Sequence, residues 1–206
     1  MNKHAYFRIF LLALFTIVYN LAEGIISVWV GAEDETLTLM GFGIDSFIEM
    51  LSGFGILYMA THLLYQFPAD KAKYEKIALN ITGFSFYMLG AGLIAGAAAG
   101  FYTAHKPEST FWGWIIALIS IAVMIWLYFS KIRLGRRLQS DAIIADAKCT
   151  VVCIYMSLVL LISSLIYEYT GFPYIDAAGA LGLAWFSFAE GRESFEKVKL
   201  LKGNRL

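Results

Sequence analysis

Long uninterrupted apolar runs are the feature that most constrains how this chain can fold. One of them extends from Ile115 to Phe129, and runs of about 20 apolar residues are typical of helices that cross a lipid bilayer. Only 16% of the 206 residues are charged, whereas soluble domains carry about 25%. The sequence therefore predicts an all-α polytopic membrane protein whose surroundings are lipid, with no nucleic-acid partner.

Six membrane-spanning helices are predicted, forming a single transmembrane domain over residues 1–206. They are expected at about 6–30, 37–66, 74–103, 109–131, 139–168 and 174–198. Pro68 and Pro107 are expected in loops and Pro173 at the start of the last helix. Since about eight residues follow the last predicted helix, no soluble C-terminal domain is expected.

The distribution of basic residues predicts the orientation of the chain. With six spans, one side of the membrane receives Lys3, Arg8, Lys71, Lys73, Lys76, Lys131, Arg133, Arg136, Arg137, Arg192, Lys197, Lys199, Lys202 and Arg205. The opposite side receives Lys106 and the acidic segment 33–35. Because cytoplasmic loops carry the excess of Lys and Arg, both termini are expected in the cytoplasm, as in a multi-pass protein of a bacterial inner membrane.

Two pairs of polar side chains fall inside predicted spans. Asp45 and Glu49 lie in the second span, and Cys149 and Cys153 lie in the fifth. Residues four apart share one face of a helix, so each pair directs two side chains toward one point. At a rise of about 1.5 Å per residue, both pairs are expected at similar depth, near the middle of the bilayer.

Two carboxylates and two sulfurs form a ligand set that suits a tetrahedral divalent ion such as Zn²⁺, and thiolates favour softer ions. A buried cysteine by itself is more often a small hydrophobic side chain. Two carboxylates in a span are harder to explain by packing, because charged groups there are costly and usually functional. We therefore predict a metal site at Asp45, Glu49, Cys149 and Cys153, with Asp146 as an accessory candidate or a simple ion-pair partner.

Other polar and small residues within the spans carry weaker signals. The role of Glu23 is left open, and Lys148 is expected to pair with Glu23 or Asp146 or to reach toward the cytoplasm. The three histidines do not form a ligand cluster in the predicted arrangement. Three glycines at a spacing of four predict close helix packing, either within the chain or with a second subunit: Gly92, Gly96 and Gly100.

At these residues the chain resembles the cation diffusion facilitator family, the cation-efflux transporters. GFGIDSFIE carries Asp45 and Glu49, and SDAIIADAKCTVVC carries Cys149 and Cys153, at the positions of that family's ligand pairs in spans two and five. TGFPYIDAAGAL and NLAEGIISVWVG are similar to its last and first spans. The resemblance implies six spans, cytoplasmic termini and a transport site between spans two and five.

The chain departs from the family pattern in two ways. Many members carry His and Asp in span five, whereas both positions are cysteine here, so the transported ion could be Zn²⁺, Cd²⁺, Co²⁺, Ni²⁺ or Fe²⁺. Many members also carry a cytoplasmic metal-binding domain after span six. Without that domain, the resemblance implies a homodimer held by transmembrane helices.

The paired ligands and the resemblance together predict a proton-coupled divalent-metal exporter. It is expected to have no permanently bound cofactor and not to be an enzyme. Three alternatives remain: a non-transporting membrane protein on the same fold, a thiol oxidoreductase, and an importer or organic-cation carrier. The oxidoreductase is disfavoured because redox pairs are usually C-x-x-C, and the direction of transport cannot be read from the residues.

Overall fold

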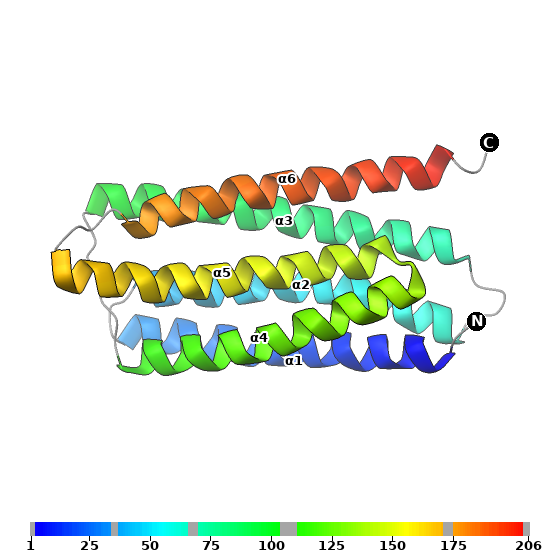
Figure 1. The fold of residues 1–206 in the computed structure, drawn as a ribbon, viewed down its shortest axis with the longest axis horizontal. Helices are drawn as coiled ribbons and strands as arrows, with labels where there is room; N and C mark the ends of the chain where they lie inside the picture. Colours follow the sequence, from blue (N-terminus) through cyan, green and yellow to red (C-terminus); the bar gives the residue numbers. More distant parts are fainter. Residues whose placement is uncertain (1–2, 34–36, 66–69, 104–110, 171–174, 204–206) are drawn as a thin grey trace.

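The computed structural model describes residues 3–33, 37–65, 70–103, 111–170 and 175–203 as six long helices in one bundle (Figure 1). The helices are α1 (Lys3–Glu33), α2 (Leu37–Tyr65), α3 (Lys71–Thr103), α4 (Phe111–Leu138), α5 (Asp141–Thr170) and α6 (Ile175–Gly203). Successive helices run in opposite directions, and both ends of the chain lie at the same end of the bundle (Figure 1). Pro68, Pro107 and Pro173 lie outside the described residues.

The predicted helical architecture is confirmed, with one difference at α6. By length and composition, α1 to α5 are each long and apolar enough to cross a membrane. In the described part of the chain α6 does not meet the same standard, because its second half carries charged side chains such as Glu190, Arg192 and Glu193. It nevertheless packs along α3 over much of its length (Figure 1).

Three helix pairs make the most extensive contacts: α1 with α2, α3 with α6, and α4 with α5. The helices that carry the predicted ligands, α2 and α5, also contact each other, and both contact α3. Ile48, Phe86, Cys149 and Val152 belong to one buried apolar cluster at this junction. The predicted ligands therefore lie in the interior of the bundle rather than on its lipid-facing surface.

Helix α4 is longer than predicted, and this changes the position of Lys131. The sequence prediction ends the fourth helix at about residue 131, whereas α4 continues to Leu138. The helix ends at Gln139, whose φ of 47° is left-handed. Ser140 N–H donates to Gly135 O and Gln139 N–H to Arg136 O, which is the Schellman pattern of helix termination. The predicted loop is thus a two-residue turn, and Lys131 lies within the helix.

The α4–α5 turn is held by side chains from α3. The Lys71 ammonium donates to the backbone carbonyls of Leu138 and Gln139, which are groups that a helix C-terminus leaves unsatisfied. The buried carboxylate of Glu75 accepts a hydrogen bond from the Ala142 amide at the start of α5. These contacts fix the point at which α5 begins, and hence the register of its thiols.

Glycines allow a close contact between α1 and α2. A Cβ at Gly43 would lie 2.7 Å from Val28 Cγ2 and 2.8 Å from Gly24 O, so only glycine fits there. The predicted packing role of the α3 glycines differs: a Cβ would meet nothing within 4 Å at Gly92, Gly96 or Gly100. Their stripe therefore does not pack against another described helix of this chain.

Candidate metal-binding site

Asp45 and Glu49 lie one turn apart on α2, facing the interior of the bundle. Asp45 is 7% exposed and Glu49 only 1%. Asp45 forms no ion pair with any described residue. Asp45 is therefore a candidate ligand without an ion-pair partner in a protein interior, the setting in which an unpaired charge is most costly.

Cys149 and Cys153 lie one turn apart on α5 and are buried, with 0% and 4% exposure. Both are free thiols, as expected for neighbours on one helix face. Each lies within electrostatic range of both Asp45 and Glu49. The two pairs thus face the same interior region from adjacent helices, although no three His, Cys, Asp or Glu side chains of the described residues are close enough to form a ready-made metal cluster.

The two oxygens of the Glu49 carboxylate have different surroundings. Oε1 accepts a hydrogen bond from Thr150 Oγ1 at 2.6 Å and lies 3.8 Å from Lys131 Nζ. Oε2 is buried and forms no hydrogen bond among the described residues, although the Cys153 thiol lies close to this carboxylate. Buried polar atoms are nearly always satisfied, so Oε2 is the atom of this site that most clearly lacks a partner.

Lys131 is the unexpected member of the site. The sequence predicts Lys131 at the cytoplasmic end of the fourth span, among the basic residues between spans four and five, but α4 continues past it to Leu138 and the residue lies within the helix. Its side chain is 2% exposed. The ammonium lies 2.9 Å from Asp146 Oδ2 and donates to Thr150 Oγ1 at 2.9 Å. With Glu49 at 3.8 Å, Lys131 connects the carboxylates of α2 and α5.

Asp146 is engaged by two partners. Ser52 Oγ donates to Oδ1 at 2.7 Å, and Lys131 pairs with Oδ2 at 2.9 Å. Ser52 in turn shares a hydrogen bond with Thr82 of α3. Of the two roles considered for Asp146, the ion pair is therefore the one that the contacts display.

Lys148 and Glu23 lie in separate networks. Lys148 pairs with Glu190 at 2.7 Å and Glu193 at 3.0 Å, so the expected pairing with Glu23 or Asp146 is wrong. Adjacent residues on a helix point about 100° apart, which directs Lys148 toward α6 while Cys149 faces the interior. Glu23 accepts hydrogen bonds from Tyr19 and Ser46 and links α1 to α2 beside the site.

Two residues of the site are not predicted from the sequence, Lys131 and Thr150. The apolar run before Lys131 continues into a segment without proline, which was a signal that the helix extends. Thr150 lies between the two cysteines in sequence and resembled an ordinary span residue. Its position one turn after Asp146 places its hydroxyl beside the same carboxylates.

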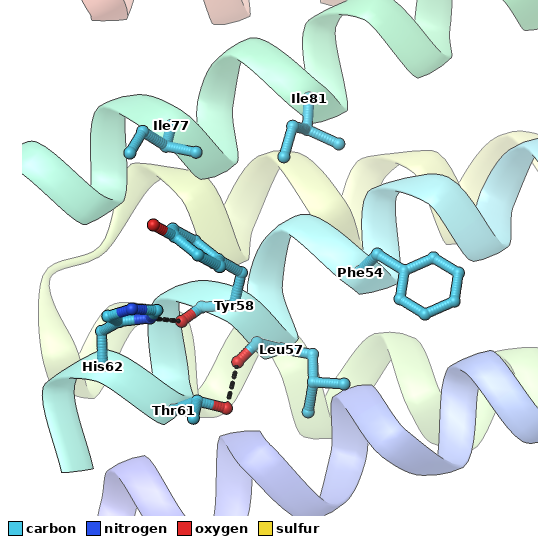
Figure 2. Close-up of a pocket in the computed structure, with 7 residues that line it drawn as sticks. All are labelled: Phe54, Leu57, Tyr58, Thr61, His62, Ile77 and Ile81. Atoms are coloured by element: carbon cyan, nitrogen blue, oxygen red, sulfur yellow. Dashed lines mark hydrogen bonds between the residues drawn. The ribbon is translucent and has the colours of Figure 1, made fainter. Parts of the chain in front are cut away.

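A groove between α2 and α3 is lined by residues other than those of this site (Figure 2). It has a volume of about 530 Å³ and is lined by apolar side chains together with Tyr58, Thr61 and His62. His62 Nδ1 is bonded to Tyr58 O and Thr61 Oγ1 donates to Leu57 O, both within α2 (Figure 2). His62 also stacks on Tyr74. The groove therefore offers no set of metal ligands.

Comparison with known proteins identifies the family. The comparison with curated proteins finds no match. The sequence model of the cation efflux transmembrane domain, however, matches residues 9–200, which include α2 to α5 and most of α1 and α6. The match covers nearly the whole chain and includes both ligand pairs. This chain therefore belongs to the cation efflux family.

Proposed function

We propose that this protein exports a divalent transition-metal ion, Zn²⁺ or a similarly soft cation, in exchange for protons. The observation that carries the proposal is the buried Glu49 Oε2, which has no hydrogen-bond partner and lies in a region shared with two buried free thiols. An acceptor oxygen without a donor is the group that a cation would satisfy. Membership of the cation efflux family supports cation transport.

The proposed ligands are Asp45 and Glu49 from α2 and Cys149 and Cys153 from α5. Two sulfurs and two oxygens match the tetrahedral preference of Zn²⁺. The sulfurs make Cd²⁺ a strong competitor and disfavour Mn²⁺. Because both oxygens of Asp146 are engaged by Ser52 and Lys131, we do not include Asp146 among the ligands that contact the ion.

Proton exchange follows from the chemistry of these ligands. Thiols and carboxylates must lose their protons to bind a metal, so metal entering from the cytoplasm expels protons. External protons then compete for the same groups when the bundle opens outward. The contact between α2 and α5 is the interface at which the ligands would separate. Inward movement of protons would thus drive outward movement of metal.

Orientation and assembly belong to the same proposal. Both termini would face the cytoplasm of a bacterial cell, because the basic residues gather at that end of the bundle. A homodimer through transmembrane helices is supported by the open glycine stripe on α3, where a second subunit could approach closely. Light scattering of the purified protein in detergent, giving the mass of two chains, would test the dimer.

The test of the function is metal flux in proteoliposomes with an imposed pH gradient. Zn²⁺, Cd²⁺, Co²⁺, Ni²⁺, Fe²⁺ and Mn²⁺ would be compared for the wild type and for two double variants, Cys149→Ser/Cys153→Ser and Asp45→Asn/Glu49→Gln. We expect saturable, gradient-driven flux of Zn²⁺ or Cd²⁺ that both double variants abolish. Lys148→Met is the matched control, since it removes a lysine from α5 outside the site.

The outcomes separate the competing functions. Flux that survives in both double variants would show that the ligand assignment is wrong. Metal binding without flux would favour a non-transporting protein on the same fold, a function that the internal pairing of Lys131 with Glu49 also permits. Flux that is insensitive to the pH gradient would contradict the antiport mechanism without contradicting the assignment of the transport site.

A further inference from the structure

We propose that Lys131 is a tethered competitor of the transported ion, whose ammonium beside Glu49 lowers the affinity of that carboxylate for metal. This inference rests on the proposed function, because it deepens the account of the same site. It makes Lys131 a residue that sets the affinity for metal, and Asp146 the group that holds the lysine aside.

Lys131 lies beside two acidic side chains at once. Its ammonium lies between two carboxylates, 2.9 Å from Asp146 Oδ2 and 3.8 Å from Glu49 Oε1. All three side chains are at most 2% exposed. Charges interact strongly at such distances away from water, and a buried cation is tolerated only where opposite charges compensate for its lost hydration. The ammonium is therefore bound to this site by its own electrostatics.

A metal ion bound by Glu49 would lie close to the positive charge of Lys131. A divalent ion held by Glu49 would share that carboxylate with the Lys131 ammonium. Two cations on one carboxylate repel each other, so metal binding weakens the Lys131–Glu49 contact or requires its loss. Lys131 thus lowers the affinity of the site for metal relative to the same ligands without a lysine.

Asp146 is the group that would retain the Lys131 ammonium when it moves away from Glu49. The contact with Glu49 is the longer of the two, and Asp146 retains Lys131 when it lengthens. Ser52 holds Asp146 Oδ1 at 2.7 Å, and Thr82 shares a hydrogen bond with Ser52. Thr150 Oγ1, which accepts from Lys131 and donates to Glu49 Oε1, lies between the two positions. Asp146 therefore weakens the competition by keeping the ammonium on the α5 side.

This arrangement predicts opposite effects for two changes that each remove one charge. Asp146→Asn removes the group that holds the ammonium aside, so Lys131 depends more on Glu49 and competes more strongly with metal. Adding Lys131→Met to Asp146→Asn removes the competitor. The second change is then expected to reverse the first, because it removes the positive charge that opposes the metal.

The experiment is equilibrium Cd²⁺ binding to the purified full-length protein, followed by titration calorimetry and by the ultraviolet charge-transfer band of Cd²⁺ bound to thiolates. We expect Asp146→Asn to weaken Cd²⁺ binding at least about tenfold. We expect Lys131→Met/Asp146→Asn to bind at least as tightly as the wild type. Lys131→Gln/Asp146→Asn is the second version of the double variant, in case the methionine version does not fold.

The control is Lys148→Met, which removes a lysine of α5 that pairs with Glu190 and Glu193 instead and is expected to leave Cd²⁺ affinity unchanged. A double variant that binds as weakly as Asp146→Asn would overturn the proposal and make Asp146 a metal ligand. Folded variants with unchanged affinity would overturn it too, leaving Lys131 a structural ion pair. A wild type that binds no Cd²⁺ at the thiols would instead overturn the proposed function itself.

Discussion

At the scale of single residues, the site depends on the Thr150 hydroxyl, which the sequence did not predict as part of it. Thr150 Oγ1 donates to Glu49 Oε1 at 2.6 Å and accepts from Lys131 Nζ at 2.9 Å. It therefore fixes which oxygen of Glu49 is satisfied within the protein and leaves Oε2 free. Residues that orient metal ligands in this way typically contribute about 10–100-fold to metal affinity.

We expect Thr150→Val to weaken Cd²⁺ binding by about tenfold or more, whereas Thr150→Ser should retain near wild-type affinity. Valine matches threonine in shape but leaves two buried polar groups without their shared partner, which costs about 1–3 kcal/mol of stability. Calorimetric binding and thermal unfolding in detergent would measure both effects. Thr61→Val is the matched control, since the Thr61 hydroxyl bonds only to a carbonyl of its own helix.

Equal Cd²⁺ affinity in the valine and serine variants would show that the Thr150 hydroxyl does not position Glu49. The shared helix face of each proposed ligand pair could be predicted from sequence, because its members are four residues apart. The partners of Glu49 could not be predicted from sequence. Thr150 and Lys131 are 101 and 82 residues away from Glu49 in the chain, and the packing of α5 against α2 and of α4 against α5 brings them together.

At the scale of helices, the α1–α2 contact positions the carboxylates. Gly43 lies two residues before Asp45, and its α-carbon faces Val28 and the Gly24 carbonyl of α1. The packing of α2 against α1 therefore sets where the Asp45 and Glu49 turn lies relative to α5. Glu23 reinforces this contact by accepting a hydrogen bond from Ser46.

Gly43→Ala is expected to destabilise the protein by about 1–3 kcal/mol, because its Cβ would lie 2.7 Å from Val28 Cγ2 and force the helices apart. Gly41→Ala is the control on the same helix, since a Cβ there meets nothing within 4 Å. Helix propensity favours that change by up to about 1 kcal/mol. Thermal unfolding midpoints in detergent would test the pair, and equal midpoints would contradict the close contact described here.

The helices could be predicted from sequence to within a few residues at most ends, since apolar runs and prolines mark them. The end of α4 is the exception. The end of α4 depends on a left-handed Gln139 and on Lys71 reaching from α3 to the Leu138 carbonyl. Neither feature has a local sequence signal, because glutamine is not a typical C-terminal helix residue and the lysine is distant in the chain.

At the scale of the whole molecule, the bundle has two chemically different ends. The end that holds both termini (Figure 1) also holds the α4–α5 turn and the exposed basic side chains Arg133, Arg136 and Arg137. The opposite end holds the last turn of α1, with Ala32 and Glu33 exposed. The positive-inside rule supports the proposed orientation, in which the first end faces the cytoplasm.

Cysteine labelling in intact cells tests this orientation directly. Arg136→Cys is expected to react with a membrane-impermeant maleimide only after the cells are opened, whereas Ala32→Cys should react before. The native thiols serve as the internal control, because Cys149 and Cys153 are 0% and 4% exposed and should remain unlabelled in the wild type. Labelling of Arg136→Cys in intact cells, with Ala32→Cys protected, would reverse the orientation. Metal that binds from the cytoplasm would then have to enter at the end that holds the last turn of α1, while inward movement of protons would still drive metal outward, because the direction of exchange follows the gradient.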